Sequence, residues 1–494
     1  MQLIQDKKRL RLIILLSLLF MFSAHAFCYA NLSFSGASVM VDAAKGNSTL
    51  ISDGQFLVTL YLRIRGSLSA PFVVGLLTAL YITAAAVLIA DLLRISHPLS
   101  LFALCGTLAL HISVTAVNAS MLHIADAYFL AFLFSALGVW LCFRHPLGFI
   151  AGTVCFAAVP GLEPAMYAAG PALALTACLV RTAKGEDVRF LIISLFKALL
   201  GFAAGFALYV LAALVFCRRQ GLELNAAFHF PYGSGVMEAY LFPIRQLFEP
   251  STAYAALCAF LFGVLLALSL IAILIRLPML GAPAKTLMLA SAALLPLVIC
   301  LPVFGTKAES AVSQRFACCI LPVSMAALLE LFCGALSARS GMILRRAIAC
   351  AFGVTFLSSI VFANQVYLKK NLEYQTTLSV MTRVIEMAEQ TEGFDPSSTP
   401  VAIVGSIDES ALSIPHKGFE HLSVLDAAAN NFTASSQEEN IWYFWEIMGY
   451  PFNFISDYER DLLAQTPDVH AMPAFPDRDC CRMVEGTLVI RLSE

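Results

Sequence analysis

Residues 70–93 read "APFVVGLLTALYITAAAVLIADLL", an apolar segment whose one charged residue, Asp91, lies close to its end. A helix of about 20 apolar residues spans the ~30 Å hydrocarbon core of a bilayer. The rest of the chain has the same character: of its 494 residues, 59% are hydrophobic and 13% are charged, and its mean hydropathy is +0.80. Soluble globular proteins rarely reach these values. The sequence therefore predicts a polytopic, mainly α-helical membrane protein.

Further apolar stretches of similar length predict about eleven transmembrane helices in all. Basic residues gather in alternate connections, and the positive-inside rule then places the N-terminus in the cytoplasm. With an odd number of crossings, the C-terminal residues and the longer loops 31–69 and 218–252 lie on the outer side. The first stretch is long enough to be an uncleaved first helix. The other stretches fall near 10–30, 99–117, 124–143, 147–163, 165–181, 190–217, 253–277, 286–304, 316–337 and 347–365.

The composition becomes more polar after about Gln365, which predicts a transmembrane domain over 1–365 and a small extracytoplasmic α/β domain over 366–494. Within the second domain, "TPVAIVGSI" and "GTLVIRLS" are typical of strands and "IWYFWEIMGYPF" of a helix with an aromatic face. No Gly-rich loop precedes a helix, so we expect no nucleotide site. The net charge is −2 without a basic block, which argues against nucleic acid as a partner.

The 14 cysteines lie mostly in apolar runs, where cysteine behaves as a small hydrophobic residue. The sequence has no CxxC or HxxxH pattern, so it predicts no metal site, and we expect no cofactor. Cys480 and Cys481 are neighbours near the C-terminus. A disulfide between neighbours is strained, so we expect two free thiols or one bridge to another cysteine.

The first outer loop contains "ISDGQFLVTLYLRIRGSLS", residues 51–69, with apolar residues at helical spacing. This pattern predicts an amphipathic helix lying in the membrane interface. Asp53 stands where the helix should begin and has two interpretations. It caps the helix, or limited water and apolar walls raise its pKa and make it a general base.

Two further carboxylates fall at the edges of predicted spans. Asp126 enters the fourth span within one turn of His123, where a charge is costly unless it is paired, faces a cavity or caps the helix. Glu163 lies in "PGLEPAMY" just before Pro164. That stretch predicts a broken helix lining a pocket, or a solvated bend.

A few arginines lie on the predicted outer side, and Arg63, Arg65 and Arg315 are the candidates for binding a phosphate group. The guanidinium fork fits phosphate oxygens, although each arginine alone can also extend to lipid headgroups. Loop 218–252 adds His229 and Tyr232 in an aromatic-rich stretch. Such a stretch suits a sugar ring, and an interfacial aromatic belt has the same composition.

Several of these pieces occur in an order that resembles the GtrII-like bacterial glucosyltransferases: "ISDG", "RIRGSLS", "NASMLHIADAY", "PGLEPAMY" and "QRFACCILP". That family has a GT-C-like architecture and transfers sugar from a polyprenyl-phosphate carrier on the outer face of the bacterial inner membrane. Its first loop usually shows two adjacent acidic residues followed by an arginine. Here Asp53 matches the first acid, Gly54 stands in place of the second, and the following arginine is missing.

The resemblance implies a hexosyltransferase that moves a sugar, with glucose expected, to a surface glycan such as O-antigen. An acceptor hydroxyl would attack C1 of the donor while Asp53, or Asp126 as its substitute, takes the proton. Arg65 and Arg315 would neutralise the departing phosphate, and Asp126 and Glu163 would bind sugar hydroxyls. The expected partners are the lipid-linked donor, the glycan acceptor and membrane lipids.

Three other functions are compatible with the same features. A flippase or transporter of lipid-linked sugars would have a similar outer cavity, but it would need polar residues at mid-membrane, and the spans contain few, chiefly Lys197 and His111. An O-antigen polymerase or ligase would usually carry a large loop between late helices rather than a terminal domain. A purely structural membrane subunit would leave every glycan unchanged when Asp53 is substituted.

Overall fold

The computed structural model describes residues 6–31, 42–224, 236–246, 255–300, 312–405 and 437–493. In these residues, 10 helices are long and apolar enough to cross a membrane, and the shorter apolar helix α9 (Gly148–Leu162) lies between two of them. This arrangement confirms a mainly helical, multi-pass membrane protein with a small strand-containing C-terminal region. The spanning segments are α2 (Lys7–Ala30), α5 (Pro71–Leu92), α6 (Pro98–Ala109) with α7 (Ile112–Ser120), η3 (Leu122–Ile124) with α8 (Ala125–Arg144), η4 (Pro164–Ala168) with α10 (Ala169–Ala183), α11 (Val188–Gln220), α13 (Ala255–Arg276), α14 (Ala282–Ile299), η7 (Val312–Cys319) with α15 (Ile320–Ala335), and α16 (Ala338–Glu389).

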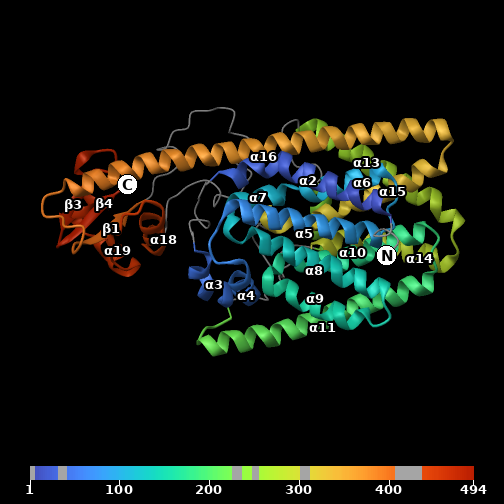
Figure 1. Ribbon diagram of the computed structural model, residues 1–494, viewed down its shortest axis with the longest axis horizontal. Helices are drawn as coiled ribbons and strands as arrows, with labels where there is room; N and C mark the ends of the chain where they lie inside the picture. The colour runs from blue at the N-terminus through green and yellow to red at the C-terminus, as the bar shows by residue number, and fades with distance from the viewer. Residues whose placement is uncertain are drawn as a thin grey trace.

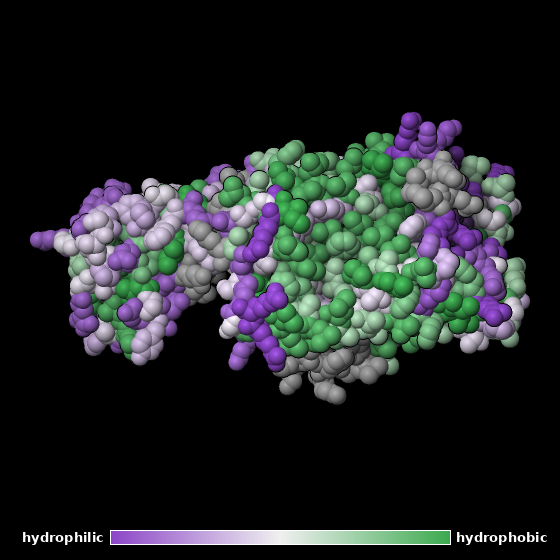
Figure 2. All heavy atoms as spheres, turned by 60° about the horizontal axis from the view of Figure 1, so that its bottom comes forward, coloured by the Kyte–Doolittle hydropathy of each residue, from purple (hydrophilic) through white to green (hydrophobic). Residues whose placement is uncertain are grey.

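The helices differ in how much of their apolar surface the protein itself covers. In the most apolar 18-residue stretches of α11 and α13, only 22% of the residues are buried, whereas 94% are buried in the corresponding stretch of the span that contains α10. Exposed leucine, isoleucine and phenylalanine side chains cover the outer helices, and Figure 2 shows hydrophobic residues over the visible face of the bundle, with hydrophilic residues gathered toward its ends. An apolar surface this broad fits contact with lipid rather than water.

Local sequence sets where several helices begin, end or break. Asp187 accepts hydrogen bonds from the first amides of α11, and Gly221 ends that helix in a left-handed conformation with φ 68°. The third span breaks between α6 and α7, where the His111 side chain caps α7 by accepting from the Ser113 amide. The predicted stretch 99–117 is therefore two short helices rather than one.

The first loop folds against one end of the bundle as η2 (Ala43–Gly46), α3 (Asn47–Ser52) and α4 (Phe56–Arg65). The Ala43 amide donates to the Ser67 carbonyl over 3.0 Å, which brings the two ends of the loop together. The predicted amphipathic helix is observed as α4, but its predicted start at Asp53 was wrong. Gly54, at φ 82°, separates α3 from α4.

The long helix α16 continues for 52 residues from the bundle into the C-terminal region, so the expected boundary at 365/366 falls inside one helix (Figure 1). That region carries a four-stranded sheet in the order β2-β1-β4-β3. The central strand β1 runs parallel to β2 and β4, and β3 is antiparallel to β4. The strands are β1 (Pro400–Val404), β2 (Asn453–Phe454), β3 (Cys481–Val484) and β4 (Thr487–Arg491).

Each face of the sheet is covered by helices. Met381 and Val384 of α16 pack with Phe444 and Phe452 on one face, while Leu463 and other apolar residues of the segment 457–472 cover the opposite face. The predicted strands correspond to β1 and β4, and the predicted helix 441–452 is shorter, consisting of α18 (Gln437–Trp442) and the π-helical turn η10 (Tyr443–Ile447). The strands β2 and β3 and the helices α19 (Asp457–Ala464) and α20 (Pro467–His470) were not predicted.

Figure 1 places α3 and α4 at the same end of the bundle as the C-terminal region, and the N-terminal end of the described chain at the opposite end. The chain therefore enters and leaves the bundle at opposite ends. Which end faces the cytoplasm stays a prediction from the positive-inside rule.

Candidate functional site

The C-terminal end of α4 is attached to the bundle by a buried ion pair. Arg65 Nη1 lies 2.9 Å from Asp126 Oδ1 in the first turn of α8, and the two side chains are 2% and 0% exposed. The Tyr61 hydroxyl donates to Asp126 Oδ2 over 2.7 Å and lies 3.2 Å from the Tyr81 hydroxyl on α5. Both carboxylate oxygens of Asp126 are therefore occupied, which offsets the cost of burying the charge.

Two polar atoms beside this ion pair have no hydrogen-bond partner among the described residues. They are Arg65 Nη2 and His123 Nδ1, and both are buried. Arg65 lies close enough to His123 for its charge to act on the imidazole ring. Buried polar atoms are almost always hydrogen-bonded in native proteins, so unpaired ones call for a water molecule or a ligand atom. We refer to Tyr61, Arg65, Tyr81, His123 and Asp126 as the α4 cluster.

The other end of α4 is held by a second carboxylate, Glu163, which lies in the bend between α9 and η4. Gln55 Nε2 donates to Glu163 Oε2 over 2.9 Å, and the Ala165 amide donates to Glu163 Oε1 over 3.0 Å. Burial raises the pKa of Glu163 to about 7, although hydrogen bonds from Ala165, Tyr128 and Gln55 favour the charged form. With 3% of the residue exposed, Glu163 is not part of a solvated bend, and the predicted break in the helix is confirmed.

Asp53 lies in the turn between α3 and α4, two residues before Gln55. The residue is exposed and occupies the C-terminal cap position of α3. It is therefore not the N-terminal cap of α4. Gln55 holds that position, and its side chain makes no capping hydrogen bond. Partial burial raises the pKa of Asp53 above its usual value. No hydrogen bond or ion pair reaches its carboxylate from the described residues.

The structure places the predicted site residues at two ends of one helix. With its 10 residues, α4 rises about 15 Å, so Asp53 and Glu163 lie near one end and Arg65 and Asp126 at the other. Arg63 lies on an exposed part of the same helix. His229 and Tyr232, which were predicted to contact a sugar ring, lie outside the described residues.

Arg315 belongs to a different polar area. Its Nη1 donates to Gln246 Oε1 over 3.4 Å, and its guanidinium carbon lies 5.4 Å from the centre of the Phe242 ring. Gln246 and His111 line a mostly apolar cavity of about 110 Å³ at the break between α6 and α7. These contacts of Arg315 are made with α12 (Val236–Gln246) rather than with the α4 cluster.

The sequence did not identify several partners of the predicted residues. Tyr61 lies in the predicted amphipathic helix and was not selected as a site residue, yet its hydroxyl bonds to Asp126. Its position four residues before Arg65 is the signal that would have found it, because such residues share a helix face. Tyr81, inside an apolar span, and Gln55 gave no signal of their own.

Comparison with known proteins finds no matching family model, no similar curated protein and no similar solved structure. The assignment to a family therefore stays a prediction from the sequence.

Proposed function

We propose that the protein is a membrane glycosyltransferase of GT-C-like architecture that uses a polyprenyl-phosphate-linked sugar as donor. The observation that carries the proposal is the unpaired Arg65 Nη2 beside the unpaired His123 Nδ1, both buried at the edge of an apolar bundle. A phosphate oxygen would accept a hydrogen bond from the guanidinium group, which is the best-suited side chain for this contact. Asp126 would hold Arg65 in position.

The surface around Arg65 suits the lipid part of such a donor. Leu60, Ile64 and Leu68 are 49%, 80% and 66% exposed on the same loop. A polyprenyl chain could cover these side chains while its phosphate reaches Arg65, because the apolar and charged groups lie within a few residues of each other. This supports a donor that is amphipathic, rather than a free sugar phosphate.

The proton of the acceptor hydroxyl would pass to Asp53, at the other end of α4. The distance from the arginine to the base can be estimated from three contacts of about 3 Å each: arginine to phosphate, acceptor oxygen to C1, and base to hydroxyl. Together with the linkage from phosphate to C1, they require roughly 10–12 Å in total. This length is shorter than the rise of α4, about 15 Å, so the donor would have to lie along the helix for its phosphate and its sugar to reach the two ends. Glu163, with its pKa raised to about 7, would bind a sugar hydroxyl. Both oxygens of Asp126 are occupied, so we assign it no proton transfer.

The test is a transfer assay with protein in proteoliposomes, polyprenyl-phospho-glucose and a cell-surface glycan acceptor. We expect Asp53→Asn to lower the rate on the order of 10²-fold. Arg65→Lys, which keeps the positive charge, should lose a similar factor because an ammonium group cannot hold Asp126 and a phosphate oxygen in the fixed planar geometry of the guanidinium group. Asp468→Asn, an exposed aspartate of the C-terminal region, is the matched control and should transfer at the parent rate.

Two outcomes would overturn the proposal. Absence of transfer by folded parent protein, across several lipid-linked donors and acceptors, would contradict the enzymatic function. Movement of the lipid-linked sugar across the proteoliposome membrane without transfer would identify a flippase instead. Retention of full activity in Asp53→Asn would keep the reaction class and remove Asp53 as the base.

A further inference from the structure

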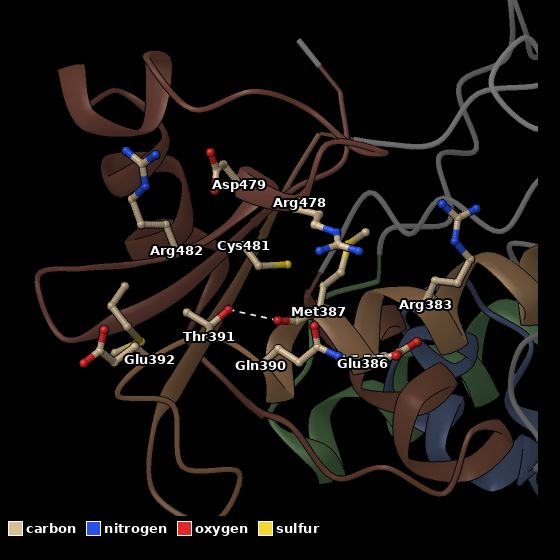
Figure 3. A pocket seen from close by; sticks show the side chains of 11 residues that line it. Arg383, Glu386, Met387, Gln390, Thr391, Glu392, Arg478, Asp479, Cys481 and Arg482 are labelled. Atoms are coloured by element: carbon tan, nitrogen blue, oxygen red, sulfur yellow. Dashed lines mark hydrogen bonds between the residues drawn. The ribbon is translucent and has the colours of Figure 1, made fainter.

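The C-terminal region contains an open cavity of about 530 Å³ between the end of α16 and the segment formed by η11 (Arg478–Cys480) and β3. Three arginines and three carboxylates line it, so its charges balance. The sulfur-containing side chains of Met387, Cys481 and Met483 also line it. Figure 3 shows Met387 on α16 and Cys481 on the strand at this cavity.

The Cys480 sulfur lies close to two other sulfur atoms. Cys480 Sγ is 3.8 Å from Cys481 Sγ and 3.9 Å from Met387 Sδ. Both cysteines are free thiols, and Cys480 and Cys481 are 0% and 7% exposed. The thiols are therefore protected from bulk water, while Cys481 borders the cavity through which a small ion can enter.

We propose that Cys480, Cys481 and Met387 form a binding site for a soft monovalent metal ion of the Cu(I) type. Metal–sulfur bonds of about 2.3 Å hold the sulfur atoms around one ion roughly 3.8–4.0 Å apart, whether the arrangement is tetrahedral or trigonal. The separations of Cys480 Sγ from Cys481 Sγ and from Met387 Sδ both fall in this interval. Cys480 Sγ therefore has each of its two sulfur neighbours at a distance that one bound ion would bridge.

The chemistry of the ligands selects the ion. Thiolate and thioether sulfur together favour Cu(I), whereas zinc sites use thiolate, imidazole and carboxylate ligands. In the described part of the chain, no group of three or more His, Cys, Asp and Glu side chains could hold a metal ion. Zinc would thus find two of its usual ligands here, while Cu(I) finds three of its own.

Binding would connect two parts of the C-terminal region that are far apart in sequence. Met387 belongs to the last turns of α16, and the cysteines belong to η11 and β3. An ion held by both would fasten the sheet to the long helix that emerges from the bundle. Because the ion binds the folded state, it would also stabilise that state. This inference does not depend on the proposed transferase function.

The experiment uses the reduced, full-length protein in detergent, titrated with Cu(I) under anaerobic conditions against a chromophoric Cu(I) chelator. We expect one tightly bound equivalent in the parent that Cys481→Ala loses. Met387→Leu keeps the volume and the apolar packing and should bind at least tenfold more weakly. Cys155→Ala removes a half-buried thiol far from the cavity and should retain the tight equivalent.

A second measurement keeps the test decisive if a variant is destabilised. X-ray absorption of the loaded parent should show only sulfur neighbours around copper, and Cu(I) should raise the thermal midpoint of the parent but not that of Cys481→Ala. Equal tight binding in the parent and Cys481→Ala would show that the sulfurs only fill the core. Preferential binding of zinc to the parent, unchanged in Met387→Leu, would overturn the assignment of the ion.

Discussion

Arg65 and Arg478 belong to two regions that differ in how far they bury an arginine side chain. In the α4 cluster, the Arg65 side chain is 2% exposed and paired with Asp126. In the C-terminal cavity, Arg478 is exposed and has no ion pair with a described residue. Water screens the exposed charge, whereas the buried charge needs its partner because the surrounding dielectric is low. Burial, rather than the presence of charge, therefore indicates which arginine matters for folding and for a candidate site.

The carboxylates show the same contrast through their pKa values. Burial raises the pKa of Glu163 to about 7, while hydrogen bonds from the Ser456 side chain and amide lower the pKa of exposed Glu459 below its usual range. One carboxylate is kept partly protonated near neutral pH, and the other is held ionised as the third residue of α19, where it bonds to the capping residue Ser456. The buried carboxylate can therefore change its protonation near neutral pH, whereas the exposed one stays ionised there.

The largest expected effect comes from breaking the buried ion pair. Arg65→Ala leaves Asp126 buried without its cation, which should lower the free energy of unfolding by about 3–5 kcal/mol. The measurement is denaturant unfolding in mixed micelles, with exposed Arg63→Ala on the same helix as the control. Combining Arg65→Met with Asp126→Leu should recover most of the loss, because an apolar pair needs no partner charge. A near-zero effect of Arg65→Ala would mean that water already reaches Asp126.

A core substitution in the C-terminal region should have a large effect of a different kind. Leu488 is 0% exposed in the central part of the sheet, and Leu488→Ala should cost about 2–5 kcal/mol through the cavity it creates. We expect faster proteolysis within residues 437–493 while the helical bundle stays protected. Leu462→Ala, at a position 50% exposed on α19, is the control. Simultaneous loss of protection in the bundle would show that the two regions unfold as one unit.

Much of the helical architecture could be predicted because hydrophobic length alone specifies a spanning segment. Ten of the eleven predicted stretches overlap the observed candidate spans, and the stretch 147–163 corresponds to the shorter helix α9, which ends at the bend before Glu163. The break inside the third span could not be predicted, since His111 caps α7 with a side chain that looks isolated in the sequence. The start of α4 was misplaced because residue preference favours aspartate as a cap, while Gly54 decides where the chain turns.

The partners of the site residues were less predictable, because they depend on contacts between distant segments. Asp126 and Arg65 were both chosen from the sequence, but as separate substrate ligands. They lie 61 positions apart, and no local sequence pattern indicates that they form a pair. The pairing also changes their expected roles, because the Arg65 guanidinium and the Asp126 carboxylate bind each other. The sulfur cluster was missed for the same reason: Met387 and Cys480 are 93 positions apart, and no metal-binding spacing connects them.

Glu163 predicts a pH dependence that separates the buried carboxylate from the exposed ones. Its pKa in the folded protein, about 7, is above its usual value of 4.5, so between these values the folded state holds more proton than the unfolded state. Stability contributed by Glu163 is therefore complete below about pH 4.5 and is lost as the pH rises through 7. The loss is of the order of 3 kcal/mol at most.

Unfolding measured from pH 4.5 to 8 in the parent, Glu163→Gln and Glu459→Gln would test this dependence. Glu163→Gln should flatten the profile over this interval, because the amide does not ionise. Glu459→Gln should keep the slope of the parent. A parent-like slope in Glu163→Gln would assign the pH dependence to another group and place Glu163 in a more hydrated position than its 3% exposure indicates.

The smallest expected effect is that of Arg478→Gln in the C-terminal cavity. Arg478 is exposed and unpaired with any described carboxylate, so the change in unfolding free energy should stay within about 0.5 kcal/mol. Denaturant unfolding beside Arg65→Ala gives the direct comparison. A loss as large as that of Arg65→Ala would mean that Arg478 is bound to a carboxylate or a ligand in solution, and burial would then no longer distinguish the two regions. A small loss of unfolding free energy in Arg478→Gln, together with a large loss in Arg65→Ala, would show that the low dielectric around α4 makes the Arg65–Asp126 pair necessary for stability.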